Sequence, residues 1–165
     1  YTNATITGID ISQGMLDVGV EKITKKGLTN RIQLQLADSE NLPFQDNSYD
    51  AITAGFGVRN FEDLNKGLSE MYRTLKSGGK VAILEPSEPT NFPLKQFYNL
   101  YFHHILPFIG GIISKDKNAY TYLPDSVSAF PSGKDFLTEL DKVGFKESKH
   151  IPLTFGIVSL YIAIK

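Results

Sequence analysis

Residues 50–60 read DAITAGFGVRN, a short apolar run that leads into two glycines, an arginine and an amide. The apolar run at 50–54 is typical of a parallel strand, and a helical pattern of apolar residues begins soon after Asn60. In open α/β sheets, ligands bind at the carboxyl ends of the strands. The sequence therefore places Arg59 and Asn60 beside a polar reaction site.

A second strand end of the same kind lies some 45 residues earlier, where the run at 4–9 is followed by Asp10. A carboxylate there can accept hydrogen bonds from two ribose hydroxyls, as in dinucleotide-type folds. The alternative is an acid that interacts with the dipole of the following helix. The two strand ends together predict a nucleoside-type cofactor beside the reaction site.

The overall composition narrows the class of protein. The chain has 165 residues, which is the size of one domain, and a formal net charge of −1, which gives no reason to expect nucleic acid as a partner. It contains no cysteine, which excludes disulfides and thiolate chemistry and fits a cytoplasmic protein. No apolar run is long enough to span a bilayer.

Alternating strand and helix patterns predict a mostly parallel sheet with right-handed crossovers. We expect strands at 32–36 and 81–85. We also expect three helices: one at 12–26 capped by Ser12, one at 64–75 ended by Gly78 and Gly79, and one at about 132–143 ended by Gly144. The tail at 145–165 is expected to close the sheet as an antiparallel pair.

The segment at 92–113 is rich in aromatic residues and interrupts this alternation. We therefore predict one domain over 1–165 with a helical, aromatic-rich insertion at about 90–130. The insertion either covers the sheet as ordinary core, or forms a lid or groove for the apolar tail of a ligand and touches a membrane surface.

For several other polar residues, the sequence supports a functional role less strongly. Asp38 and Ser39 follow the strand at 32–36 and could present a carboxylate and a backbone N–H to adenine, although such an acid is usually part of a turn. His103 and His104 are candidate bases on different faces of a helix, and His150 is expected to be incidental. No histidine, cysteine or carboxylate cluster has the spacing of a metal site, so none is predicted.

The chain resembles the S-adenosylmethionine-dependent C-methyltransferases of menaquinone and ubiquinone biosynthesis, over essentially its whole length. The residues that carry the resemblance are GIDISQGML at 8–16, LPF at 42–44, DNSYD at 46–50, GFGVRN at 55–60, EMYRTLKSGGK at 70–80, LEPS at 84–87, YLPDS at 122–126 and GF at 144–145. The GFGVRN run is the most specific of these to the quinone branch.

The resemblance implies a class I methyltransferase fold, Rossmann-like and α/β, with strand order 3-2-1-4-5-7-6 and strand 7 antiparallel. It also implies that Asp10 holds the ribose, and that Asp38 and Ser39 frame the adenine. Ile11, Met15 and Gly55 belong to the same cofactor site, and Gly55 stands where some relatives have a serine.

The implied reaction is C-methylation of a prenylated quinol, demethylmenaquinol to menaquinol, with S-adenosyl-L-methionine as cofactor. Arg59 would stabilise the phenolate or orient a water molecule, with Asn60 as its hydrogen-bond partner. The alternative for Arg59 is a structural cation that caps backbone carbonyls. The rival readings are the equivalent methylation of a benzoquinol in ubiquinone biosynthesis and a non-catalytic α/β binding module. The resemblance allows a homodimer and peripheral membrane contact.

One departure from the family is large. The family's first strand and its glycine-rich turn are absent, and we read the chain as the C-terminal part of a longer domain. The absent strand would lie between the strands at 4–9 and 51–54. A central parallel strand is buried on both faces, so its absence opens the sheet. We expect the isolated 165 residues to bind the cofactor poorly and to be inactive.

Overall fold

The computed structural model describes residues 3–101 and 124–165. Its secondary structure alternates along the first half of the chain and ends in an antiparallel pair, as predicted. The elements are β1 (Ile6–Asp10), α1 (Gln13–Lys25), β2 (Ile32–Leu36), β3 (Tyr49–Gly55), α2 (Leu64–Thr74), β4 (Leu75–Pro86), α3 (Leu94–Leu100), α6 (Lys134–Val143), β5 (Lys146–Leu153) and β6 (Val158–Ile164). The described residues also contain two short 3-10 helices, η1 (Val58–Asn60) and η3 (Thr154–Gly156).

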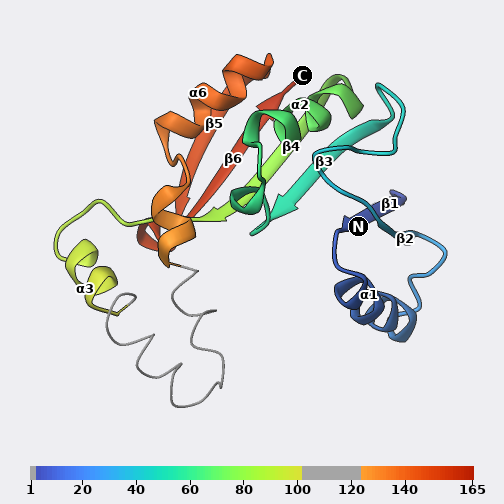
Figure 1. Cartoon of the computed structure of the whole chain (residues 1–165), viewed down its shortest axis with the longest axis horizontal. Coiled ribbons are helices and arrows are strands. Elements are labelled where there is room, and N and C mark those ends of the chain that lie inside the picture. The colour runs from blue at the N-terminus through green and yellow to red at the C-terminus, as the bar shows by residue number, and fades with distance from the viewer. Residues whose placement is uncertain (1–2, 102–123) are drawn as a thin grey trace.

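The strands form two separate sheets. β1 and β2 pair in parallel, and the other four strands have the order β3-β4-β6-β5, with β3 parallel to β4 and β6 antiparallel to both its neighbours. In Figure 1 the β1–α1–β2 unit, in blue, lies beside the end of the larger sheet that β3 forms. Within the described residues no strand pairing joins β1 to β3, which is where the sequence predicts a missing strand.

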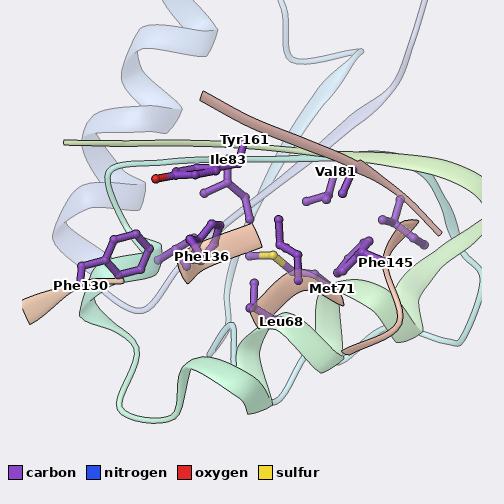
Figure 2. Packing of buried hydrophobic residues seen from close by; sticks show 12 residues of the cluster. Leu68, Met71, Val81, Ile83, Phe130, Phe136, Phe145 and Tyr161 are labelled. Carbon is purple, nitrogen blue, oxygen red and sulfur yellow. The ribbon is translucent and has the colours of Figure 1, made fainter. Parts of the chain in front are cut away.

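The hydrophobic core belongs to the larger sheet. α2 and α6 pack against each other on one face of it, and Figure 2 shows side chains from both helices meeting those of β4 and β6. Phe136 of α6 lies 4.6 Å, centre to centre, from the ring of Tyr161 on β6. The largest buried side chains of this cluster include Leu68, Leu75 and Ile83. This core gives the carboxyl ends of β3 and β4 a rigid support.

Local signals explain where the helices begin and end. Ser12 caps α1, with its hydroxyl accepting from the Met15 N–H, and Asp63 caps α2 in the same way through the Lys66 N–H. Gly144 ends α6 in the left-handed conformation, with φ 114°.

The predicted end of α2 at Gly78 and Gly79 is wrong. The helix ends at Thr74, because Leu75 adopts an extended backbone and pairs with Tyr49 as the first residue of β4. Strand pairing therefore begins before the glycines, and Gly78 instead occupies a left-handed bend with φ 76°.

The predicted insertion is described in part. α3 and a helical stretch at 124–129 lie within it, and residues 102–123, with His103 and His104, lie outside the described residues. Among the described helices, none combines the length and the apolar character that crossing a membrane requires.

Candidate active site

Asp10 and Asp38 lie at the carboxyl edge of the small sheet. β1 ends at Asp10, whose backbone oxygen accepts from the Ala37 N–H just beyond β2 at 3.2 Å. One oxygen of each carboxylate closes a local turn: Asp10 Oδ1 accepts from the Ser12 N–H, and Asp38 Oδ1 from the Glu40 N–H, both at 2.8 Å. No hydrogen bond to described residues is recorded for either second oxygen, Oδ2. Both carboxylates are thus oriented and keep an acceptor for a ligand.

Apolar side chains stand exposed beside these carboxylates. Ile11 is 76% exposed and Met15, in the first turn of α1, is 61% exposed. Ser39 is partly buried next to Asp38. Acceptors for hydroxyl and amine groups therefore stand next to apolar surface. This donor and acceptor set fits the ribose, the adenine and the aliphatic chain of a nucleoside thioether.

The residues after β3 form the second part of the site. Gly55 ends β3, and a Cβ placed on it would meet nothing within 4 Å, so the described residues leave room there. Phe56 follows with φ 58°, a left-handed backbone that a bulky side chain rarely adopts, and its N–H donates to the Leu84 carbonyl at 2.8 Å. This strained turn aims the Phe56 carbonyl back toward η1.

Arg59 is held inside the protein by a carboxylate from the neighbouring strand. Its Nη1 donates to Glu85 Oε2 at 3.0 Å and to the Phe56 carbonyl at 2.6 Å, and its Nε lies 3.4 Å from Ser126 Oγ. The Arg59 side chain is 11% exposed and that of Glu85 is fully buried. The other oxygen of Glu85, Oε1, accepts from the Val58 N–H at 2.7 Å. Glu85 therefore fixes both η1 and its arginine.

The pairing changes what Arg59 can do chemically. Glu85 compensates its charge, so Arg59 offers a neighbouring molecule a directed N–H bond rather than a free positive charge. No bond to described residues is recorded for its Nη2. Arg59 also lines a cavity of about 370 Å³ together with Glu62, Ser126 and Pro131. Asn60, next to it in η1, is exposed.

Glu40 links the two parts of the site. Its two carboxylate oxygens accept from the backbone N–H groups of Glu62 at 2.7 Å and Asp63 at 3.2 Å. Glu40 lies two residues after Asp38, and Glu62 lies two residues after Asn60. This clasp ties the turn after β2 to the start of α2.

The structure thus gathers the predicted residues into two groups. Asp10, Asp38 and Ser39 share the small sheet, and Gly55, Arg59 and Asn60 follow β3. Asp10 lines neither the cavity beside Arg59 nor a second cavity lined by Ser87, His150 and Ser159. Among the described residues, no group of three metal-binding side chains gathers at one place.

The sequence interpretation missed two functional contributors, Glu85 and Glu40. A signal for Glu85 was present, because a carboxylate that continues the apolar run at 81–84 requires a buried partner. Glu40 gave no such signal, since it sits in a polar turn among other acids.

Comparison with known proteins fits this geometry. The model of the ubiE/COQ5 methyltransferase family matches residues 2–165. A demethylmenaquinone methyltransferase from Bacteroides fragilis is 49% identical over 160 residues, covering 97% of this chain and 65% of the relative. A ubiquinone/menaquinone biosynthesis C-methyltransferase UbiE from Geotalea daltonii is 46% identical, covering 99% of this chain and 69% of the relative. The chain thus spans about two thirds of the length of these relatives.

Solved structures agree on the fold. A SAM-dependent methyltransferase from Aquifex aeolicus superposes with a TM-score of 0.66 at 17% identity, over 97% of this chain and 68% of that one. A putative S-adenosyl-L-methionine-dependent methyltransferase from Methanococcus maripaludis gives 0.62 at 25% identity, over 98% of this chain and 66% of that one. These likenesses confirm the predicted class I, Rossmann-like α/β fold.

Proposed function

The chain belongs to the ubiE/COQ5 methyltransferase family, and on that basis we propose that the protein transfers a methyl group from S-adenosyl-L-methionine to a ring carbon of a prenylated quinol, with demethylmenaquinol as the substrate. The observation that carries the proposal is the 49% identity to a demethylmenaquinone methyltransferase across 97% of the chain. The carboxylates of the small sheet and the arginine beside the larger one supply matching chemistry.

The cofactor would be held by the residues at the carboxyl edge of the small sheet, with Gly55 of β3 beside it. The second oxygens of Asp10 and Asp38 would accept hydrogen bonds from the ribose hydroxyls and from the adenine amine, and the Ser39 N–H would meet a ring nitrogen. Ile11 and Met15 would lose their exposure against the apolar parts of the cofactor, and Gly55 would leave space beside its aliphatic chain. When bound, the cofactor supplies an electrophilic methyl group on a sulfonium sulfur.

The second group would act on the quinol. A ring carbon forms the new carbon–carbon bond as the sulfur–methyl bond breaks, while water takes up the phenolic proton and afterwards the proton of the methylated ring carbon. Arg59 cannot take up either proton, because a guanidinium stays protonated. Its Nη2 would instead donate to the developing phenolate oxygen, held in position by Glu85 and the Phe56 carbonyl, with Asn60 as a further donor.

A benzoquinol, as in ubiquinone biosynthesis, is the second candidate substrate. Its support is a relative, 46% identical, that is named for both ubiquinone and menaquinone biosynthesis, and demethylmenaquinol remains the preferred substrate. The chemistry at the ring carbon is the same for both substrates. The choice between them therefore depends on whether the site accommodates the single ring of a benzoquinol or the two fused rings of a naphthoquinol.

A methyl-transfer assay tests the proposal. The protein at its natural length is incubated with S-adenosylmethionine labelled on the methyl group and with reduced demethylmenaquinone or demethylated benzoquinol, and the extracted quinones are counted. We expect label in the naphthoquinol product. Label only in the benzoquinol would select the second candidate, and label in neither would overturn the proposal.

Contact with a membrane surface and a homodimer remain part of the proposal. A prenylated substrate resides in lipid, and several apolar side chains near the insertion are exposed, namely Phe92, Phe97, Leu100 and Tyr101. Flotation with liposomes tests the first, and sedimentation of the protein at its natural length tests the second.

A further inference from the structure

A second cavity, of about 510 Å³, lies at the carboxyl edge of the larger sheet, on the side away from β3. Its polar floor consists of Ser87 after β4, Ser159 of β6 and His150 of β5. Ser87 follows Glu85 by two residues and is buried like it, so the two side chains share one face of the chain, about 7 Å apart. The volume suits a ring system of one or two rings.

The floor is a hydrogen-bond chain whose direction is fixed at one end. Ser87 Oγ lies 2.9 Å from the Gly156 carbonyl, which can only accept, so Ser87 donates its single proton there. Ser159 Oγ lies 2.8 Å from Ser87 Oγ and must therefore donate to it. His150 Nε2 lies 2.8 Å from Ser159 Oγ, whose proton is already used. His150 must therefore be the donor, with its proton on Nε2.

This direction leaves the other ring nitrogen as an acceptor. In the neutral ring, a proton on Nε2 gives Nδ1 a lone pair. The ring is held by stacking on Tyr161 at 4.9 Å, and a Cβ on Gly133 would lie 3.9 Å from Nδ1, so the glycine leaves that side of the ring uncovered. Nδ1 forms no hydrogen bond with the described residues. Every fully buried polar side-chain atom among them has a partner, so Nδ1 is not one of the fully buried atoms.

Burial lowers the pKa of His150 below its usual value, which favours this neutral form at neutral pH. Two charged groups also line the cavity, Glu88 from the segment after β4 and Lys134 at the start of α6. Glu88 accepts a hydrogen bond from Ser128.

An exposed aromatic side chain forms part of the cavity wall. Phe155 is 80% exposed, and both Thr154 and Phe155 adopt left-handed backbones, with φ 48° and 59°. Such conformations are costly for side chains of this kind and persist where the surrounding structure holds them. Leu94 and Pro152 complete the apolar wall. An aromatic ring would find apolar contact here and one fixed acceptor.

We propose that this cavity receives the side of the quinol ring that points away from Arg59 and selects the reduced form of the ring, with His150 Nδ1 accepting a hydrogen bond from the hydroxyl opposite the oxygen that faces Arg59. A hydroquinone hydroxyl donates a proton and pairs with Nδ1. A quinone carbonyl is an acceptor only and would bring two lone pairs together. The inference rests on the proposed function and adds to it a residue that recognises the redox state of the substrate.

Two substitutions of His150 separate its nitrogens. In His150→Gln, the amide nitrogen reaches the position of Nε2 and preserves the bond to Ser159, while the acceptor at Nδ1 is lost. In His150→Asn, the side-chain oxygen takes the place of Nδ1 and the contact with Ser159 is lost. Lys134→Met is the control for a cation that could donate to a carbonyl. Circular dichroism melts confirm that each variant is folded.

Binding of 1,4-naphthohydroquinone and 1,4-naphthoquinone is measured by anaerobic equilibrium dialysis with the full chain. The absence of cysteine removes thiol addition to the quinone as a complication. We expect the wild-type protein and Lys134→Met to bind the hydroquinone at least about tenfold more tightly, the effect of one hydrogen bond. His150→Gln should lose this preference and His150→Asn should retain most of it.

Equal binding of both probes by the wild-type protein, or an unchanged preference in a folded His150→Gln, would overturn the inference. The methyl-transfer assay separates this from failure of the proposed function. A protein that methylates demethylmenaquinol without any preference refutes the role of His150 alone. A protein that prefers the hydroquinone yet methylates no quinol refutes the methyl-transfer proposal instead.

Discussion

Arg59 and Glu85 show how one buried pair sets the geometry of a strand end. The carboxylate is fully buried and divides its oxygens between a backbone N–H and the guanidinium. Removing one partner of such a pair leaves the other as an uncompensated charge, which costs far more than the intact pair contributes. The pair therefore fixes the position of Arg59 rather than adding much net stability.

Glu85→Ala should destabilise the protein by about 3 kcal/mol, because it strands the Arg59 charge and leaves the Val58 N–H unpaired. Urea unfolding followed by circular dichroism measures the change. The exposed pair of Lys76 and Asp50 provides the control, and Lys76→Ala should cost less than about 1 kcal/mol. Similar losses in the two variants would contradict the buried pair's importance.

Arg59→Lys should separate catalysis from cofactor binding. The lysine keeps a positive charge near Glu85 but loses the planar fork that reaches the Phe56 carbonyl, Glu85 and the substrate together. We expect turnover in the methyl-transfer assay to fall about 100-fold. The dissociation constant of S-adenosylmethionine, measured by calorimetry, should remain within about twofold. Equal loss of both would mean that Arg59 supports the cofactor site instead.

At the residue scale the sequence predicted positions better than partners. Asp10 and Gly55 end strands as expected, because strand ends follow from local patterning. The partner of Arg59 could not be predicted, because Glu85 lies 26 residues away and faces it only through the parallel register of β3 and β4. The acceptor role of His150 was equally hidden, since it depends on side chains from three strand ends.

At the scale of elements, Arg73 of α2 anchors the irregular segment between β2 and β3. Its guanidinium donates to the carbonyls of Leu42 and Phe44 and to the carboxylates of Asp46 and Glu70. These hydrogen bonds raise the pKa of Arg73, with Glu70 as the largest cause. The hydrogen bonds of this one side chain thus hold in place a segment that has no regular secondary structure of its own.

This anchor should weaken in acid. The hydrogen bond from Arg73 is the main reason that the pKa of Glu70 is below its usual value of 4.5, so the folded state favours the carboxylate. The stabilisation is present above the unfolded pKa and is lost as the pH falls through the lower, folded one. Tm should therefore fall from about pH 5 toward pH 3 less steeply in Glu70→Gln than in the wild-type protein.

Glu21→Gln, which alters an exposed pair with Lys25 on α1, is the control and should follow the wild-type curve. Parallel curves for wild-type protein and Glu70→Gln would contradict a role for this carboxylate in acid stability.

The elements themselves were largely predictable. The caps at Ser12 and Gly144 and the apolar periodicity placed α1 and α6, and the end of α2 was misplaced because strand pairing overrode the glycine signal. The segment between β2 and β3 could not be derived, since its contacts come from side chains on a helix further along the chain.

At the scale of the whole molecule, the proposed site is divided between two sheets: the small sheet carries the carboxylates proposed to hold the cofactor, and the larger sheet carries Gly55 and the residues proposed to act on the quinol. The Ile6 side chain of β1 is 48% exposed, and every residue of β3 is either exposed or partly exposed. Strands at the centre of a parallel sheet are normally buried on both faces. The edges of β1 and β3 that face away from their partners are therefore incomplete in the described residues.

The 165 residues by themselves should bind S-adenosylmethionine weakly, with a Kd of about 1 mM or higher, because only part of the cofactor's surface would be covered. Isothermal calorimetry measures this, and the demethylmenaquinone methyltransferase from Bacteroides fragilis provides the comparison. Micromolar binding by the 165 residues would show that the small sheet and Gly55 suffice.

Among the described residues no strand pairing joins β1 to β3, and the segment between β2 and β3 connects the two halves through the hydrogen bonds of Glu40 and Arg73. Both carboxylate oxygens of Glu40 accept hydrogen bonds from the backbone that directly precedes α2, close to η1. A nucleoside that drew the Asp38 turn toward itself would pull this carboxylate, and with it the loop that carries the guanidinium. Binding of the cofactor would thereby shift the position of Arg59, the residue proposed to contact the quinol, through a connection only a few residues long.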